Sequence, residues 1–229
     1  GNMITGSTNV GKSYAKYDLD LSGIIAFGKV AAVSKTLTSI DLSNCGIAAA
    51  GIAEVTKFIS AEAAVKKINL SGCPLTGAIK SSANWYEIDS DMTGFIALCG
   101  VLGKLHEINM SDCGLGAASA GEFAKAVSDA DAAVVSINCL QNNFGDEGLS
   151  TLLSAIKGTS VRSLCGLTEG QTIADFSGQN LGPFDCKIMA AESAFSGFIA
   201  ALNSLRCGSN PITDKGMIPL LDAVKGIGL

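Results

Sequence analysis

The sequence predicts an α/β fold in which short strands alternate with helices in a stack of repeated units. Three observations support this prediction: a strand-like apolar pattern recurs along the 229 residues, a Cys or Asn follows each copy, and helical periodicity begins at a fixed distance beyond it. The chain is 48% hydrophobic but only 6% aromatic. We therefore expect a single domain over residues 1–229, with a continuous core of Leu, Ile, Val and Ala in thin layers.

The repeated strand segment has apolar residues spaced as L-x-x-L-x-L, then two residues, a Cys or Asn, one further residue and another apolar side chain. Alternate residues of such a segment point to one side of a strand, while the Cys or Asn can bond backbone groups at the turn. Strands of successive copies are expected to pair in parallel. The five clear copies span residues 37–47, 65–75, 105–115, 134–144 and 202–212.

A helix is predicted after each strand segment, because apolar residues follow at i, i+3, i+4 and i+7. In four copies this set begins seven residues after the Cys or Asn, so strand and helix keep a common register. The four sets are Ile52, Val55, Thr56 and Ile59; Ala120, Phe123, Ala124 and Val127; Leu149, Leu152, Leu153 and Ile156; and Met217, Leu220, Leu221 and Val224.

Residues 1–36 precede the clear copies and are interpreted as an N-terminal segment with a capping repeat, since a stack must shield its open end. In this repeat, residues 19–21 resemble a truncated strand and 24–33 its helix. The same segment holds Gly6–Ser13, which matches the phosphate-binding pattern G-x-x-x-x-G-K-[ST]. That chemistry needs a buried strand before the loop and a helix after it. Neither is evident, so nucleotide binding is kept only as a minor alternative.

Residues 37–229 hold about six repeats, interrupted by insertions near 78–92 and 167–172. The first insertion delays the next helix, whose apolar set begins at Phe95. The second leaves two readings of residues 161–181 open: one split repeat or two abbreviated ones.

Residues 142–149 read Asn-Asn-Phe-Gly-Asp-Glu-Gly-Leu, and 210–217 read Asn-Pro-Ile-Thr-Asp-Lys-Gly-Met. With repeats of 28–29 residues and a full helix in each, the region from Leu37 onward resembles the ribonuclease-inhibitor-like subfamily of leucine-rich repeats. The resemblance implies a right-handed β-α solenoid with a parallel sheet on the concave side and helices on the convex side. It also implies a non-enzymatic role in binding a protein partner. The Ran GTPase-activating proteins share this repeat class, so a GTPase-activating or other regulatory role is the alternative.

Charge and hydropathy narrow the class of partner. The net charge is −5 and no basic patch is evident, which opposes nucleic-acid binding. The longest apolar stretches, around Gly23–Phe27 and Phe95–Gly103, are shorter than the roughly 18–20 residues of a membrane helix. The chain opens without the basic start and apolar run of a signal peptide, so we expect an intracellular, cytoplasmic protein. The sequence does not predict the partner's identity or the oligomeric state.

The eight cysteines show no C-x-x-C spacing and mostly follow the repeat, so we expect neither disulfides nor a metal site. Most are expected to be buried as small apolar side chains. Cys165 is the exception, because it falls at an outward strand position and is the candidate reactive thiol. The buried assignments are Cys45, Cys73 and Cys113 at the turn, Cys139 and Cys207 inward on strands, and Cys99 in a helix core.

Outward strand positions form columns that a partner on the sheet face would touch. They hold no aromatic side chain, although Trp, Tyr and Arg usually supply the strongest contacts of a protein interface. Two interpretations therefore stay open: a surface that binds through hydrogen bonds, or a structural polar ladder. Ser136 and Ser163 share a column with two of the charged candidates. The candidate contact residues are Asp41, Lys67, Asn69, Glu107, Asn109, Asn138 and Arg206.

Trp85 and Tyr86 lie in the first insertion and form the alternative contact patch, with local packing as the competing interpretation. No catalytic residue and no cofactor is expected. The single histidine, His106, precedes Glu107 at the start of a strand, where neighbouring side chains point to opposite faces and cannot act as a pair.

Overall fold

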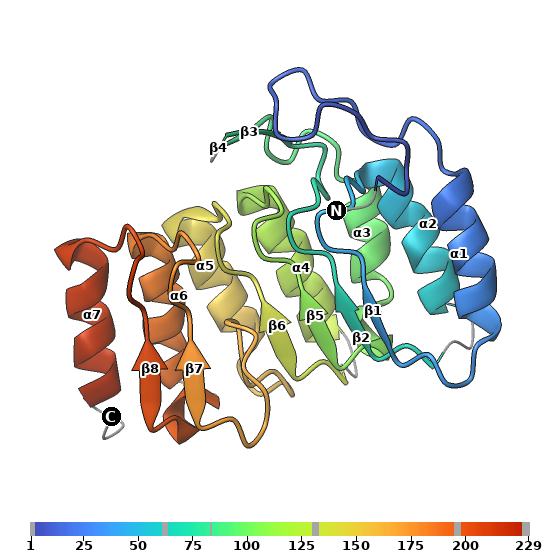
Figure 1. Cartoon of the computed structure of the whole chain (residues 1–229). Helices are drawn as coiled ribbons and strands as arrows, with labels where there is room; N and C mark the ends of the chain where they lie inside the picture. The colour runs from blue at the N-terminus through green and yellow to red at the C-terminus, as the bar shows by residue number, and fades with distance from the viewer. Residues whose placement is uncertain (1–2, 61–63, 83, 130–132, 195–197, 226–229) are drawn as a thin grey trace.

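The computed structural model describes residues 3–60, 64–82, 84–129, 133–194 and 198–225. Short strands alternate with helices along the chain, as the sequence predicts for an α/β protein. The parallel strands lie in one layer, and the helices stand side by side in a second layer behind them (Figure 1). The two ends of the helix layer are formed by the first and the last helix.

Among the residues that the structure describes, six strands are parallel, but they form two sheets. Corresponding residues align across the larger sheet, so the inward isoleucines at 40, 68, 108 and 137 lie in one row. The first sheet has the order β1 (Ser39–Asp41), β2 (Lys67–Asn69), β5 (Glu107–Asn109) and β6 (Ser136–Asn138), and the second pairs β7 (Ile173–Asp175) with β8 (Ser204–Arg206). The first insertion forms an antiparallel hairpin of β3 (Ile79–Ser81) and β4 (Asn84–Tyr86).

The expectation of one continuous parallel sheet is wrong between β6 and β7. Residues 161–166 bond to β6, where the N–H of Cys139 donates to the C=O of Leu164 at 3.0 Å, yet they form only isolated bridges. Elsewhere in this segment, the N–H groups of Leu164 and Cys165 donate to the carboxylate of Glu192, at 2.9 and 3.1 Å. Since these two N–H groups bond a side chain, they are not available to β7.

Helices follow the strands as predicted. The sets that begin at Ile52 and Ala120 are buried throughout, whereas Leu153 is half-buried and Leu221 is exposed on the last helix. The helices are α1 (Ser22–Val33), α2 (Ala49–Ser60), α3 (Thr93–Cys99), α4 (Ala117–Asp129), α5 (Gly145–Ala155), α6 (Pro183–Ala194) and α7 (Asp214–Lys225), with short 3-10 turns at Leu102–Lys104 and Phe198–Ala201.

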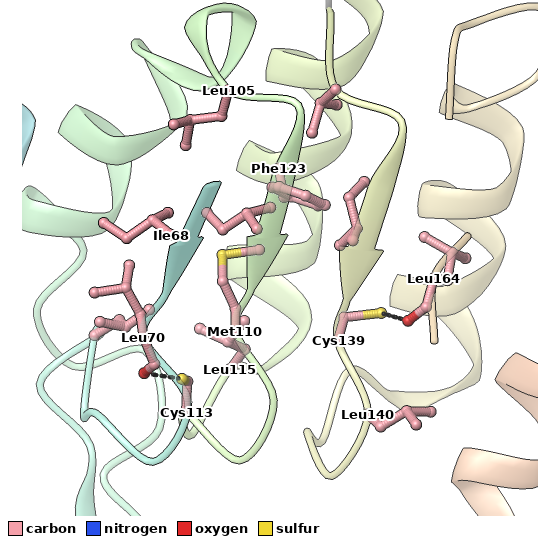
Figure 2. Close-up of a cluster of buried hydrophobic side chains, with 14 of the residues drawn as sticks. Ile68, Leu70, Leu105, Met110, Cys113, Leu115, Phe123, Cys139, Leu140 and Leu164 are labelled. Carbon is pink, nitrogen blue, oxygen red and sulfur yellow. Dashed lines mark hydrogen bonds between the residues drawn. The ribbon is translucent and has the colours of Figure 1, made fainter. Parts of the chain in front are cut away.

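The core lies between the two layers, and Figure 2 shows its central part. Inward residues such as Ile68 and Met110 meet helix residues such as Phe123 there. Fully burying one such apolar side chain is worth about 1.5–3 kcal/mol, so repeated layers supply the main stabilisation. None of the eight cysteines forms a disulfide.

The turn residues after the strands tie each repeat to a neighbouring one. The Cys113 thiol donates to the C=O of Leu70 at 3.2 Å. Asn142, at the equivalent position, accepts the N–H of Cys113 at 3.0 Å and donates to the C=O of Met110 at 2.8 Å. A Cys or an Asn is therefore required there because the turn leaves buried backbone groups that need partners.

The N-terminal segment differs from its expected capping strand. Residues 19–21 form no strand, and the N–H of Asp20 instead donates to the C=O of Thr5. Gly6–Ser13 lies in a loop that is closed by antiparallel pairing of Thr8 with Lys16, and the next helix begins only at Ser22. This loop therefore lacks the helix that would point its N-terminus at a phosphate.

Candidate functional site

The sheet carries a shallow hollow of about 270 Å³. It runs across all four strands of the larger sheet and is bordered by the loop after Ser163, through Gly166. The outward side chains that line it are Ser39, Asp41, Lys67, Asn69, Glu107, Asn109, Ser136 and Asn138. We call this feature the strand-face hollow.

The structure brings together six of the nine candidate contact residues. These six line the strand-face hollow: Asp41, Lys67, Asn69, Glu107, Asn109 and Asn138. The other three lie elsewhere. Arg206 is on β8, where its guanidinium lies 3.6 Å from Asp175, and Trp85 and Tyr86 are on the hairpin.

The asparagines of the hollow are held by their own backbone. The side-chain oxygen of each accepts the N–H two residues ahead: Asn69 from Ser71 at 3.1 Å, Asn109 from Ser111 at 3.0 Å, and Asn138 from Leu140 at 3.2 Å. These bonds fix the amide plane. The Nδ2 groups are thereby left as oriented donors, and that of Asn69 reaches Asp41 at 3.2 Å.

Charged groups of both signs lie within the hollow. Lys67 and Glu107 form an ion pair of 2.6 Å between adjacent strands. Hydrogen bonds from the backbone N–H and the hydroxyl of Ser43 lower the pKa of Asp41, so its carboxylate is charged at neutral pH. Lys67 and Glu107 are both at least partly exposed, so their ion pair contributes about 0–1 kcal/mol to stability. Either charged group can therefore exchange its partner for a ligand.

Two serines of the first outward column are buried. Ser136 keeps its outward position, aligned with Glu107, so the column assignment is wrong only at Ser163. Ser136 lies at the edge of the hollow, and Ser163 donates its hydroxyl to Glu192 at 3.0 Å. Cys165 is also not an outward thiol: it is only 2% exposed. Burial, followed by the nearby charge of Glu192, raises the pKa of Cys165 well above its usual range. The column prediction failed because residues 161–166 do not continue as a regular strand.

Helix α6 carries two buried carboxyl groups, Asp185 and Glu192, that were not singled out from the sequence. Burial raises the pKa of Glu192, and one of its oxygens has no hydrogen-bond partner. Burial likewise raises the pKa of Asp185, which accepts the N–H groups of Gln141 and Gly182. A signal was present in the sequence, since Asp185, Ile188 and Glu192 share one helix face with Met189 at i, i+3, i+4 and i+7.

The hairpin lies beyond the carboxyl ends of the first strands (Figure 1). Its Trp85 is half-buried and donates its indole N–H to Asp112 at 2.9 Å, while Lys80 pairs with the same carboxylate. Lys80 also stands over the Trp85 ring, 5.2 Å from its centroid. Tyr86 differs from Trp85, because it is 53% exposed and available to a partner.

Within the described ranges, no group of three or more His, Cys, Asp or Glu side chains is placed to hold a metal ion. No helix among these residues has both the length and the apolar character to cross a membrane.

Comparison with known proteins agrees with the repeat found in the first strand and helix. No curated protein matches the chain. Residues 33–55 match the sequence profile of the family described as Leucine Rich repeat, and they cover β1 and the first half of α2. Leucine-rich repeats generally mediate protein–protein interactions and are generally not enzymes. Residues 33–55 are therefore similar to a leucine-rich repeat in sequence, and β1 and α2 give them the strand-helix arrangement that the repeat pattern predicts.

Proposed function

We propose that the chain is a non-enzymatic scaffold that binds a protein partner, built as a right-handed solenoid of the ribonuclease-inhibitor-like class of leucine-rich repeats. One observation carries this proposal: six outward residues selected from the repeat pattern line a single polar hollow. The shared register of β1, β2, β5 and β6 supports it, because the outward side chains then stand in rows.

The chemistry of the strand-face hollow favours a partner that presents hydrogen-bond acceptors. The amide groups of Asn109 and Asn138 are fixed donors, since their oxygens are bonded to their own backbone. Backbone carbonyls of an exposed loop or an extended segment would accept from them. The lining contains no aromatic side chain, so we expect an affinity on the order of micromolar unless a second surface adds to it.

Tyr86 is the candidate for that second surface. Its ring is exposed on the hairpin, and tyrosine supplies a large contact area at low cost in conformational entropy. The two surfaces belong to the same body, because Trp85 and Lys80 bind the hairpin to Asp112 in the turn after β5. A partner seated on the hollow could therefore also contact Tyr86.

Partner capture tests this proposal. The purified chain is used as bait in an extract of its native source, and the retained proteins are quantified by mass spectrometry. Asn109→Arg places a long cation in the hollow, and we expect it to reduce the retained partner about tenfold. Ser150→Arg is the matched control, because it places an arginine at an exposed position of α5, in the helix layer and away from the hollow.

A partner retained equally by wild type, Asn109→Arg and Tyr86→Ala would contradict the use of both surfaces. Circular dichroism of each variant separates a loss of contact from a loss of fold. An Asn109→Arg variant that keeps the wild-type spectrum and loses the partner supports the proposal.

A further inference from the structure

Residues 163–167, which we call the wall segment, form one side of the strand-face hollow. Gly166 lines the hollow together with Asn138. The two residues are so close that a Cβ on Gly166 would lie 2.9 Å from that of Asn138. The N–H of Gly166 donates to the C=O of Ile137 on β6 at 2.8 Å. The position of the wall segment therefore determines the shape of the hollow at this end.

Glu192 holds the wall segment from the helix layer. Its Oε2 accepts the hydroxyl of Ser163 at 3.0 Å and the N–H groups of Leu164 and Cys165 at 2.9 and 3.1 Å. The Ser163 hydroxyl in turn accepts the N–H groups of Cys165 and Leu167, at 3.1 and 2.9 Å. One carboxyl oxygen thus organises the whole wall segment, either directly or through Ser163.

The wall segment has little other support on the side of α6. Among the described residues, no strand pairs with it on the side away from β6, since β7 and β8 form a separate sheet. The N–H of Phe198 donates to the C=O of Arg162 at 2.9 Å, just before the wall segment begins. The N–H groups of Leu164 and Cys165 consequently depend on Glu192.

The site of Glu192 accommodates a neutral carboxyl group better than a charged one. The side chain is 0% exposed, and its Oε1 has no hydrogen-bond partner among the described residues. The lysine of the same helix, Lys187, is exposed and pairs with Asp146 instead. A buried carboxylate without a cation is unfavourable, and this burial raises the pKa of Glu192.

The titratable groups around Glu192 supply no compensating positive charge. Cys165 on the wall segment and Cys139 next to β6 are buried thiols, and burial raises the pKa of both. Asp185, on the same face of α6, is another buried carboxyl group. The charged residues of α5, β7, β8 and α7 are exposed, and so is Arg162, whose guanidinium donates to backbone carbonyls.

We propose that ionisation of Glu192 releases the wall segment and opens the strand-face hollow at Gly166, so that the hollow binds its partner more tightly at acidic than at neutral pH. This inference rests on the proposed function, because it concerns the regulation of the same hollow. Protonated at Oε1, the carboxyl group keeps Oε2 as the acceptor for Leu164 and Cys165 without carrying a charge. Once ionised, it is stabilised by water, and its hydrogen bonds to the wall segment break.

The direction of the pH dependence follows from proton binding. In the open state Glu192 is in water, so its pKa returns to the ordinary 4.5, whereas in the closed state it is higher. Opening therefore releases a proton. The closed state is most favoured below pH 4.5 and loses this advantage as pH rises through the raised pKa.

Hydrogen exchange of single amides, followed by NMR from about pH 5 to pH 8, tests the opening without a partner. Glu192→Gln is compared with wild type at equal pH, so the intrinsic exchange rate cancels. The protection of Gly166 in wild type, relative to the variant, should fall as pH rises, by at most about tenfold per pH unit, the limit for release of one proton. Asp185→Asn removes the other buried carboxyl group of α6 and should keep the wild-type response.

Low concentrations of urea separate local opening from global unfolding. The exchange of Gly166 should be insensitive to urea, whereas that of Leu70, which donates to Asn109 inside the larger sheet, should accelerate. Exchange of Gly166 that accelerates in parallel with Leu70 would mean that the wall segment opens only when the protein unfolds, and it overturns the proposal. A ratio of wild type to Glu192→Gln that does not change with pH overturns it as well.

The protein retained in the capture experiment tests the consequence for binding. Wild type and Asp185→Asn should both retain more of it at pH 5 than at pH 8, and this ratio should be smaller for Glu192→Gln. The pH dependence of the partner itself is common to all three proteins and cancels. Equal ratios for wild type and Glu192→Gln overturn the regulation of the hollow. Since hydrogen exchange needs no partner, a failure of the proposed function would leave its result unchanged.

Discussion

The indole N–H of Trp85 donates to the carboxylate of Asp112 across 2.9 Å and fastens the hairpin to the turn that follows β5. The ring also lies so close to the backbone that a Cβ on Gly114 would come within 2.9 Å of it. Lys80 covers the ring from the hairpin and pairs with the same carboxylate. Trp85 is therefore first an anchor of the hairpin, and Tyr86 is the side chain that the anchor presents.

Trp85→Ala is consequently expected to destabilise the protein by about 2–3 kcal/mol, somewhat less than truncation of a fully buried aromatic residue. Tyr86→Ala should change the free energy of unfolding by less than about 0.5 kcal/mol, because the ring is mainly exposed. Urea denaturation of both variants measures the difference. Equal losses from the two substitutions would contradict the assigned roles.

Gly114 and Gly145 form a matched pair for testing the close approach of the hairpin. Both have φ of +67°, so alanine costs similar backbone strain at either site. Only Gly114 is crowded, since its Cβ would lie 2.6 Å from that of Ala78, whereas nothing lies within 4 Å at Gly145. We expect Gly114→Ala to cost about 1–3 kcal/mol more than Gly145→Ala in urea denaturation. Equal losses of stability from the two substitutions would mean that the hairpin moves away from residue 114 at no measurable cost.

The repeat could be predicted from the sequence because it rests on local chemistry. Inward residues such as Ile40 and Ile68 repeat with strand periodicity, and Cys113 or Asn142 meets the same hydrogen-bonding demand at each turn. The rows of outward side chains followed from the same alternation, since a strand with one buried face must expose the other. The hollow that they line was not part of that prediction.

Residues 161–166 could not be predicted in this way. A column assignment assumes that each segment is a regular strand, but the carboxylate of Glu192 occupies backbone N–H groups of this segment from a helix 27 residues or more away in sequence. The two-sheet architecture and the burial of Cys165 both follow from that long-range contact. The anchoring of Trp85 by Asp112 is similarly remote in sequence.

Cys165 is expected to resist thiol reagents in the folded protein. Burial suppresses both access to the sulfur and formation of the thiolate, which is the reactive species. Cys207 is only partly buried and should be modified earlier. Timed alkylation at pH 8 followed by peptide mass spectrometry gives the order. Early labelling of Cys165 in a sample that is still folded would contradict its burial beside Glu192.

The raised pKa of Glu192 should make the free energy of unfolding depend on pH in the range above 4.5. Burial is the main cause that raises its pKa above the ordinary 4.5, although four hydrogen bonds, from Leu164, Cys165 and Ser163, oppose the shift. Between 4.5 and the raised value, the folded protein binds more protons at this site than the unfolded chain does. The contribution of Glu192 to the free energy of unfolding therefore falls as pH rises through this window. It is most favourable below pH 4.5.

The carboxyls of Asp41 and Asp175 act in the opposite sense, because hydrogen bonds from nearby serines lower their pKa below the ordinary 3.8. Their contribution is present above that value and is lost as pH falls through the lowered pKa. Glu192 and the two aspartates therefore titrate in different pH ranges. Measurements above pH 4.5 record the titration of Glu192 without that of Asp41 and Asp175.

Glu192→Gln removes the titration while keeping the size of the side chain and an oxygen that can accept from Ser163 and Leu164. We expect the melting temperature of wild type, relative to that of the variant, to rise as pH is lowered from neutral toward 4.5. Asp185 titrates in both proteins with the same sign and cancels in the difference. Melting curves of both proteins at a series of pH values measure this difference in melting temperature. A difference that stays constant with pH would show that Glu192 does not bind its proton more tightly in the folded state, whatever the offset between the two proteins.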